Sequence, residues 1–355
     1  MMVLTVGILV CASVPDWVHF PGQEWEKASP SEAGLDARRF EAWVAERDPA
    51  FRKAYGGQTP AHGGVVIARG GYILHTWGDA EFRYQSASLA KTFTRMALQL
   101  AIDDGRVSSA DDLVATYWTG EATLEDHKVM NTGHNARVRF IDLQDMRGGF
   151  PVTNGFFWET GRDVPDWARS TGDPDYDNYA HVPPGTHRVY SSGGYWRLSQ
   201  ALTAIWGRDL KDLLDERIFG PIGIPAARWD WLTGENVRET RDFYPEMPNY
   251  GGYLDPPYHL DGHVVRGGGG WAVMSAADFA RIGLLVATGG VWAGERLISG
   301  LGGNIGVAAN RMEGWGLIEG TDAYFSFGKV TTGFDDPTPE EMASWVLGGV
   351  RMGED

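Results

Sequence analysis

The chain has 355 residues, of which 43% are hydrophobic and 22% are charged, a balance typical of a globular protein that buries a substantial core. Its formal net charge of -16 excludes a surface built to hold nucleic acid or an anionic membrane, since both need clustered lysine and arginine. The single cysteine, Cys11, excludes an intramolecular disulfide.

An apolar segment, Met1 to Val14, opens the chain. It is too short to span a bilayer as a helix, so we expect no membrane-spanning segment here. It also has neither a positively charged start nor a clear small-residue cleavage site. The sequence therefore leaves two interpretations open, a removed leader or an ordered N-terminal segment.

The first regular elements are a helix and a hairpin. The helix is expected from about Leu35 to Arg52. The hairpin is expected from the β-type runs Val65–Arg69 and Tyr72–Trp77, which Gly70-Gly71 separates. A two-residue glycine loop suits the type I′ turn that joins right-twisted strands.

A second helix is expected just after the hairpin, with Ser88 at its first turn and Lys91 three residues later. It ends at Asp103-Asp104-Gly105, where glycine is a usual stop. Apolar residues recur along one face at helical spacing: Leu89, Phe93, Met96 and Leu100. Ser88 and Lys91 then share another face, one above the other.

A serine paired with a lysine in this way can carry acyl transfer. A hydroxyl is a poor nucleophile until a neighbouring base takes its proton, and a partly desolvated lysine amine can be that base. The spacing also arises often by chance, so a polar surface pair at a helix start is the alternative interpretation.

The middle of the chain, 88–263, is expected to be helical with long loops, and helices are predicted at Gly194–Trp206 and Leu210–Phe219. The loop between Phe150 and Tyr190 is rich in aromatic residues: Phe156, Phe157, Trp158, Trp167, Tyr176 and Tyr179. They form either a wall over a substrate pocket or a satellite core under a long loop.

The last third combines helices and strands. A helix with a capping box opens at Ser275 and continues to Ala287, and another opens at Thr338. Strand-like runs lie between them, near Asn304–Ala309 and Ala323–Thr332. Strands at both chain ends predict an α/β (α+β) protein, in which one antiparallel sheet is flanked by helices and has a helical insert beside it.

Four ordered blocks resemble the serine β-lactamase-like superfamily, which includes class C β-lactamases, family VIII carboxylesterases and D-alanyl peptidases. The blocks are Ser88–Thr94, Pro184–Leu198, Ile218–Ile224 and Gly269–Ala280. The resemblance runs from about Trp25 to the C-terminal helix. It implies a single catalytic unit over 15–355, with an α/β part (30–87 plus 264–355) and a helical part (88–263).

The resemblance also implies site roles. Ser88 is expected to attack a carbonyl carbon, and Lys91 to take its proton directly or through Tyr190. Tyr176 begins a Tyr-x-Asn run, Tyr176-Asp177-Asn178, and is the rival of Tyr190. We prefer Tyr190 because a helix is expected to follow it. Ser192 stands where the family usually has asparagine, which favours an ester or amide hydrolase over a dedicated β-lactamase.

A third motif is expected to complete the pocket. Lys329 to Gly333 resembles the family's Lys-Thr-Gly strand, but it comes too close to the C-terminal helix to leave room for a return strand. We prefer Ser299–Gly303, where the N–H of Gly302 or Gly303 joins that of Ser88 in an oxyanion hole. Trp158 is expected to line the pocket. Leu143–Gly149 departs from the family's Leu-Leu-x-His-Thr-Ser-Gly.

No cofactor or metal is predicted. His127 and His134 are seven apart, and neither a His-Glu-x-x-His nor a Gly-x-Ser-x-Gly motif occurs. The expected partner is a small ester, amide or peptide, and export is favoured because many resembling enzymes are exported. The alternatives are a β-lactamase or D-amino-acid peptidase with the same machinery, and a non-catalytic binding or sensor module.

Overall fold

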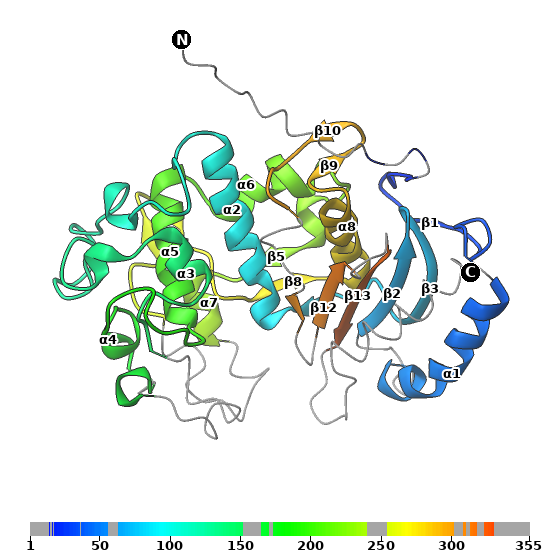
Figure 1. Cartoon of the computed structure of the whole chain (residues 1–355), viewed down its shortest axis with the longest axis horizontal. Coiled ribbons are helices and arrows are strands. Elements are labelled where there is room, and N and C mark those ends of the chain that lie inside the picture. Colours follow the sequence, from blue (N-terminus) through cyan, green and yellow to red (C-terminus); the bar gives the residue numbers. More distant parts are fainter. Residues whose placement is uncertain are drawn as a thin grey trace, which may run out of the picture.

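The computed structural model describes most of the chain between Val14 and Lys329 (Figure 1). The described residues are 14, 16, 18–35, 37–55, 63–151, 165–169, 173–239, 254–301, 308–309, 313–317 and 323–329. The expected helix at Thr338 and nearly all of the opening apolar segment lie outside them.

A six-stranded sheet joins the two ends of the chain, with the strand order β1-β3-β2-β13-β12-β11. The strands are β1 (Glu26–Lys27), β2 (Gly63–Arg69), β3 (Tyr72–Gly78), β11 (Ala308–Ala309), β12 (Glu313–Leu317) and β13 (Ala323–Lys329). As expected, the sheet is built from both chain ends: the N-terminal strands form one half, and the C-terminal strands join them where β13 pairs with β2. The prediction of a purely antiparallel sheet is wrong at one edge, where β1 runs parallel to β3. A parallel neighbour needs a long connection, and α1 (Ala37–Tyr55) lies between β1 and the hairpin.

The hairpin at the centre of the sheet has the predicted turn. Gly70 and Gly71 both have positive φ values, 59° and 88°, as a type I′ turn requires. A side chain at Gly71 would also collide with the backbone oxygen of His19. The consecutive residues Val65 and Val66 of β2 are both fully buried, so both faces of the sheet are covered. In Figure 1 the sheet lies between α1, which contacts β3, and α8 (Ala276–Ala287), which contacts β13, β12 and β2.

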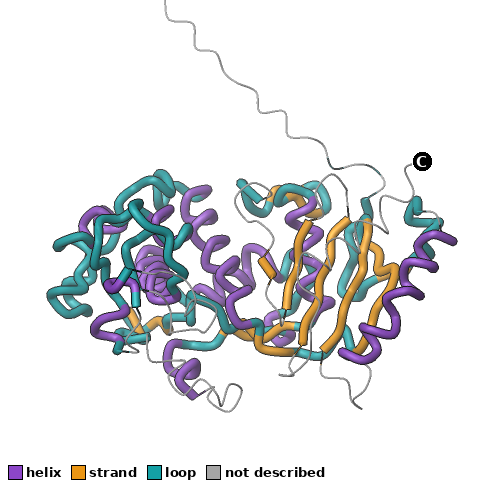
Figure 2. Tube along the Cα trace, turned by 60° about the horizontal axis from the view of Figure 1, so that its bottom comes forward, coloured by secondary structure: helices purple, strands orange, loops and turns teal. Residues whose placement is uncertain are grey.

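The helical part lies beside the sheet (Figures 1 and 2). Its helices are α2 (Lys91–Asp103), α3 (Phe140–Gln144), α4 (Pro174–Asp177), α5 (Ser192–Trp206), α6 (Leu210–Leu214) and α7 (Gly234–Glu239). Single helical turns are η1 (Ala87–Ala90), η2 (Val114–Thr116), η3 (Asn135–Arg137), η4 (Asp166–Ala168), η5 (Asp215–Phe219) and η6 (Ala226–Arg228). Small sheets pair β4 (Tyr84–Gln85) and β5 (Asp230–Trp231) with β8 (Ala272–Met274), β6 (His259–Leu260) with β7 (His263–Val264), and β9 (Val291–Trp292) with β10 (Glu295–Arg296).

Local capping rules set the ends of the main helices. The hydroxyl of Ser191 accepts a hydrogen bond from the N–H of Gly194 and opens α5, two residues before the predicted start. Ser275 opens α8 by accepting from the N–H of Asp278, as predicted. Gly105, with φ 70°, follows the end of α2 at Asp103, which is the expected stop.

Helix α2 is the centre of the largest core cluster. Phe93, Met96 and Leu100 of the predicted stripe are fully buried, and so are Ala97 and Leu98 on other faces. The ring of Phe93 meets four aromatic rings at centroid distances of 5.0 to 6.1 Å: Phe219, Trp229, Trp231 and Phe279. Apart from its exposed last residue and a partly exposed stripe at Arg95, Gln99 and Ile102, α2 is buried, which makes it a rigid base for whatever lies at its N-terminus.

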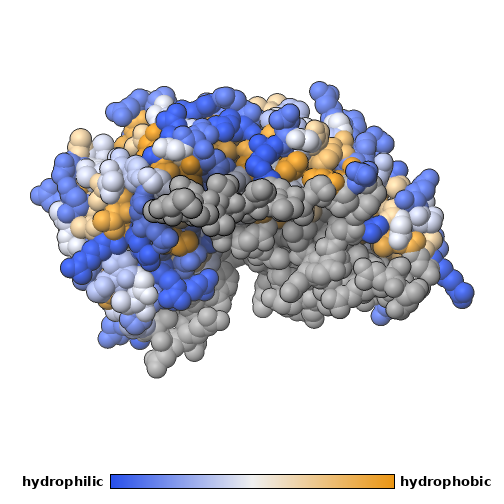
Figure 3. Space-filling view, turned by 45° about the horizontal axis from the view of Figure 1, so that its top comes forward, coloured by the Kyte–Doolittle hydropathy of each residue, from blue (hydrophilic) through white to orange (hydrophobic). Residues whose placement is uncertain are grey.

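The described surface is largely polar. Figure 3 shows hydrophilic residues over much of the coloured part of the face that it presents. Among the helices that the structure describes, none combines the length and the apolar character needed to cross a membrane.

Candidate active site

Ser88 lies on the turn η1, which runs directly into α2. The α-helix itself begins at Lys91, three residues later than the sequence predicts. In a 3₁₀ turn, side chains three apart lie directly above one another, so Ser88 and Lys91 stay aligned. Lys91 Nζ is 3.1 Å from Ser88 Oγ. Strands β12 and β8 both contact η1, so Ser88 lies where the sheet meets the helical part.

Four groups surround the amine of Lys91. Besides Ser88 Oγ, Nζ is 3.1 Å from Tyr190 Oη and 3.3 Å from Ser192 Oγ, and it donates to the carbonyl oxygen of Gly269. Tyr190 Oη also donates to Ser88 Oγ at 2.5 Å. An amine nitrogen has only three positions for hydrogen bonds, so the serine, the tyrosine and Ser192 compete for two of them once the carbonyl is bound.

The electrostatics of Lys91 favour its neutral form. The residue is only 7% exposed, and among the described residues no carboxylate is within ion-pair distance of it. Burial and, to a smaller extent, the positive charge of Arg95 lower the pKa of Lys91 to about 7. A large fraction of the amine is therefore unprotonated near neutral pH, and an unprotonated amine can accept a proton.

Close backbone approaches at two glycines bring the start of α5 and the segment of Gly269 together beside Lys91. A side chain at Gly193 would collide with the backbone oxygen of Asp177, and one at Gly269 would press on Ser192. The carbonyl oxygen of Gly268 accepts a hydrogen bond from Thr94 Oγ1 at 2.7 Å, which fixes the turn that contains Gly268 and Gly269 to α2. The sequence interpretation missed Gly269 as a site residue. The run of four glycines ending at Gly270 was the available signal.

The rival tyrosine is occupied elsewhere. Tyr176 Oη donates to the backbone oxygen of Trp167 at 3.0 Å, and its ring packs on His181 with 4.1 Å between centroids. Burial raises the pKa of Tyr176. The structure thus brings Tyr190 to Ser88 and does not bring Tyr176 there.

Of the preferred third motif, Ser299 to Leu301 are described, whereas Gly302 and Gly303 lie outside the described residues, as does Trp158. The described part of the motif packs at the C-terminal end of α2, where Ser299 Oγ is 2.9 Å from the side-chain nitrogen of Gln99. Ser88 precedes the other end of that helix, roughly 20 Å away at 1.5 Å per residue. Lys329 ends β13, opposite Gly63 of β2.

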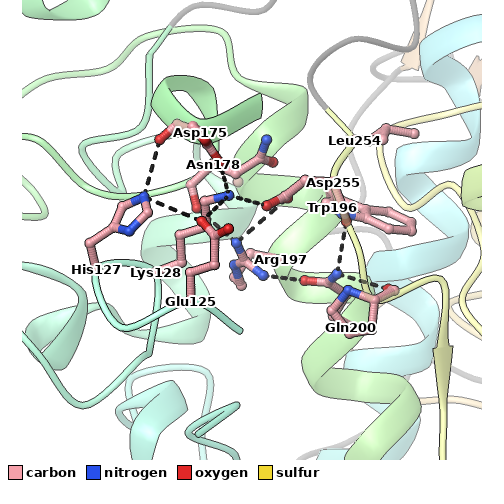
Figure 4. A network of polar contacts seen from close by, with 12 residues as sticks. Glu125, His127, Lys128, Asp175, Asn178, Trp196, Arg197, Gln200, Leu254 and Asp255 are labelled. Carbon is pink, nitrogen blue, oxygen red and sulfur yellow. Dashed lines mark hydrogen bonds and ion pairs between the residues drawn. The ribbon is translucent and has the colours of Figure 1, made fainter. Parts of the chain in front are cut away.

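One group of possible metal ligands occurs among the described residues: Glu125, His127 and Asp175, all exposed. Figure 4 shows that the ammonium group of Lys128 already pairs with the carboxylates of this group, those of Glu125 and Asp175. Lys128 Nζ is 3.2 Å from Glu125, 2.7 Å from Asp175 and 2.5 Å from the buried Asp255. The cluster is therefore an ion-pair network beside α5.

Comparisons with known proteins agree with this geometry. Residues 49–345 match the family model described as Beta-lactamase. The chain is 24% identical over 204 residues to a D-aminopeptidase of Brucella anthropi, in an alignment that covers 52% of this chain and 37% of the relative. The chain therefore spans little more than a third of that protein.

Two solved structures share the fold. A family VIII carboxylesterase aligns with 89% of this chain and 97% of its own at a TM-score of 0.56 and 15% identity. A class C β-lactamase aligns with 88% of this chain and 96% of its own at a TM-score of 0.54 and 13% identity. At such identities the likeness establishes the β-lactamase-like fold, and the family match over most of the chain establishes the relationship. The chain belongs to the β-lactamase family.

Proposed function

We propose that the protein is a serine hydrolase that cleaves an ester or amide through an acyl-enzyme on Ser88, within one catalytic unit over 15–355. The triangle of Ser88 Oγ, Lys91 Nζ and Tyr190 Oη, with sides of 3.1, 3.1 and 2.5 Å, carries this proposal. It joins a nucleophile to a buried amine and a phenol, which is the arrangement that activates a hydroxyl.

Acylation uses each corner of the triangle. Lys91 takes the Ser88 proton, directly or through Tyr190, while Oγ attacks the substrate carbonyl carbon and the carbonyl oxygen becomes an oxyanion. In this proposal the backbone N–H of Ser88, on the turn η1 just before α2, donates to that oxyanion. When the intermediate collapses, the bond to the leaving group breaks and Tyr190 or Lys91 returns the proton to it.

Deacylation reverses the roles. A water gives its proton to Lys91, directly or through Tyr190, and attacks the acyl carbon; the bond to Ser88 Oγ then breaks and Oγ takes that proton back. Water must therefore reach the acyl carbon on the side of Lys91. A chain that acylates but cannot admit water would remain acylated and act as a binding or sensor module.

The residue at position 192 supports an ester or simple amide over a β-lactam. Ser192 offers Lys91 a hydroxyl at 3.3 Å but has no amide N–H₂ to donate to a bound substrate. The D-aminopeptidase likeness favours a second candidate, an amide or peptide with a D-amino acid.

Three chromogenic substrates separate these possibilities: p-nitrophenyl butyrate, a D-alanine p-nitroanilide and a chromogenic cephalosporin. Preferred turnover of the butyrate supports the esterase, and preferred turnover of the anilide supports the D-aminopeptidase. Comparable opening of the cephalosporin would overturn our preference against a β-lactamase. A stable adduct in the intact mass, without turnover, would identify a binding or sensor module.

Tyr190→Phe is expected to lower kcat/KM for the preferred substrate by about 10²-fold or more, since it removes a proton-transfer group from the triangle. The matched control is Tyr176→Phe, which removes a hydroxyl that donates a hydrogen bond to the backbone oxygen of Trp167. Steady-state kinetics of both variants measure the difference. A larger loss in Tyr176→Phe would return the role to the rival tyrosine.

A further inference from the structure

Arg95 lies one helical turn after Lys91 on α2, on the same face of the helix. Placing a second cation there is unfavourable for a protonated lysine, because like charges at this spacing repel. Arg95 is nonetheless held in place: its side chain is 25% exposed and lies 4.0 Å from the carboxylate of Asp145.

A closed set of hydrogen bonds fixes the guanidinium. Arg95 Nε donates to Tyr195 Oη at 2.7 Å, and its terminal nitrogen donates to the backbone oxygen of Gln144 at 2.7 Å. Tyr195 Oη donates to the same oxygen at 2.9 Å. Three elements, α2, α5 and the end of α3, therefore meet at Arg95. Gln144 and Asp145 belong to the segment that departs from the family pattern.

Tyr195 transmits this arrangement to the site. Its side chain is fully buried, and its ring centroid is 5.4 Å from Lys91 Nζ. Burial raises the pKa of Tyr195 to about 12, so it stays a neutral phenol. The titratable groups that face Lys91 in the described structure are thus Tyr190 and Tyr195, with Arg95 as the nearby fixed cation.

We propose that Arg95 is a positioning residue that locks Tyr195 beside Lys91 and places a fixed positive charge one helical turn from the amine that accepts the Ser88 proton. The effect of Arg95 on turnover rests on the proposed hydrolase function. The charge of Arg95 also acts on the lysine in the resting protein, where it is measurable without a substrate.

Carbon-13 NMR of the full chain labelled at lysine Cε tests this directly, since the chain has only six lysines and Lys91→Met identifies the Lys91 signal. Arg95→Gln is expected to raise the titration midpoint of Lys91 by about half a unit to one unit, and Arg95→Lys, which keeps the charge, to leave it near the wild-type value. The acid limb of the pH–kcat/KM profile should move by the same amount in Arg95→Gln, with little change at high pH.

Asp145→Asn provides a second variant at a half-exposed site. It removes the carboxylate that offsets Arg95, so the Lys91 midpoint should fall. An unchanged Lys91 midpoint in both Arg95→Gln and Asp145→Asn would overturn the proposal. If the midpoint moves as expected but wild-type protein turns over no substrate, the proposed hydrolase function fails and the assignment of Arg95 stands.

Discussion

Replacing Ser88 by alanine is expected to lower kcat/KM for the preferred substrate by on the order of 10⁴-fold to 10⁶-fold, since removing the nucleophile of a serine hydrolase has effects of this size. The hydroxyl is the corner of the triangle that forms the covalent bond, and neither Lys91 nor Tyr190 can replace it. The fold should survive, because η1 is held by backbone and core contacts and Ser88 is only partly buried. Steady-state kinetics measure the loss of kcat/KM, and circular dichroism measures whether the fold is retained.

The matched control is Ser86→Ala, two residues away. Ser86 is fully buried, and its hydroxyl has no hydrogen-bond partner among the described residues, so its removal leaves the site intact. Turnover should stay within a few-fold of wild type. Equal activity in Ser88→Ala and wild type would refute the acyl-enzyme on Ser88. Labelling by a fluorophosphonate, detected by intact mass, should likewise disappear only in Ser88→Ala.

Elements governed by local rules were predictable from the sequence. The Gly70-Gly71 turn and the end of α2 follow from backbone conformations that glycine alone adopts easily. The start of α8 follows from the capping box at Ser275. Strand β12 was missed, because Glu313–Leu317 contains two glycines and shows no clean alternation. The parallel edge at β1 depends on where the chain crosses the sheet, which no local pattern encodes.

The candidate site likewise has a part that local sequence rules predict and a part that they do not. Ser88 and Lys91 are three residues apart, so their pairing could be inferred from helix geometry. Tyr190 lies far along the chain, and only the family resemblance suggested it. The carbonyl of Gly269 and the contact of Arg95 with Tyr195 join elements that are remote in sequence. Such contacts arise from packing, so hydrophobic pattern and motif spacing do not specify them.

The two buried lysines are expected to respond in opposite ways to the same substitution. Lys91→Met should abolish turnover and also stabilise the fold near pH 7. The unfolded lysine holds its proton up to its ordinary pKa of 10.5, whereas burial and Arg95 lower the folded pKa to about 7. The unfolded state therefore binds more protons between these values, and this group makes the wild-type protein more stable as the pH rises from about 7 to 10.5.

The lowered pKa means that burying Lys91 destabilises the fold at neutral pH, by up to about 4 kcal/mol when the pKa difference is converted into free energy. Methionine removes this destabilisation. It also leaves the Gly269 carbonyl without its donor, which costs about 1–3 kcal/mol. The net gain in free energy of unfolding is then about 1–3 kcal/mol at pH 7. Urea unfolding of wild type and Lys91→Met between pH 6 and 9 measures it, and the gain should shrink as the pH rises.

Lys128 provides the contrast because it is just as buried but fully paired (Figure 4). Burial alone would lower the pKa of Lys128, but hydrogen bonds to Asp175 and Asp255 outweigh it and raise that pKa. Its stabilising effect is therefore complete below pH 10.5 and is lost only as the pH rises through the raised value. Lys128→Met should cost about 3 kcal/mol at every pH from 6 to 9, the lower end for breaking a buried pair, since Asp255 loses its ammonium but keeps Arg197 at 3.9 Å. A loss of stability in Lys91→Met as large as that in Lys128→Met would mean that Lys91 is held as a paired cation, and it would remove the basis for its role as the base.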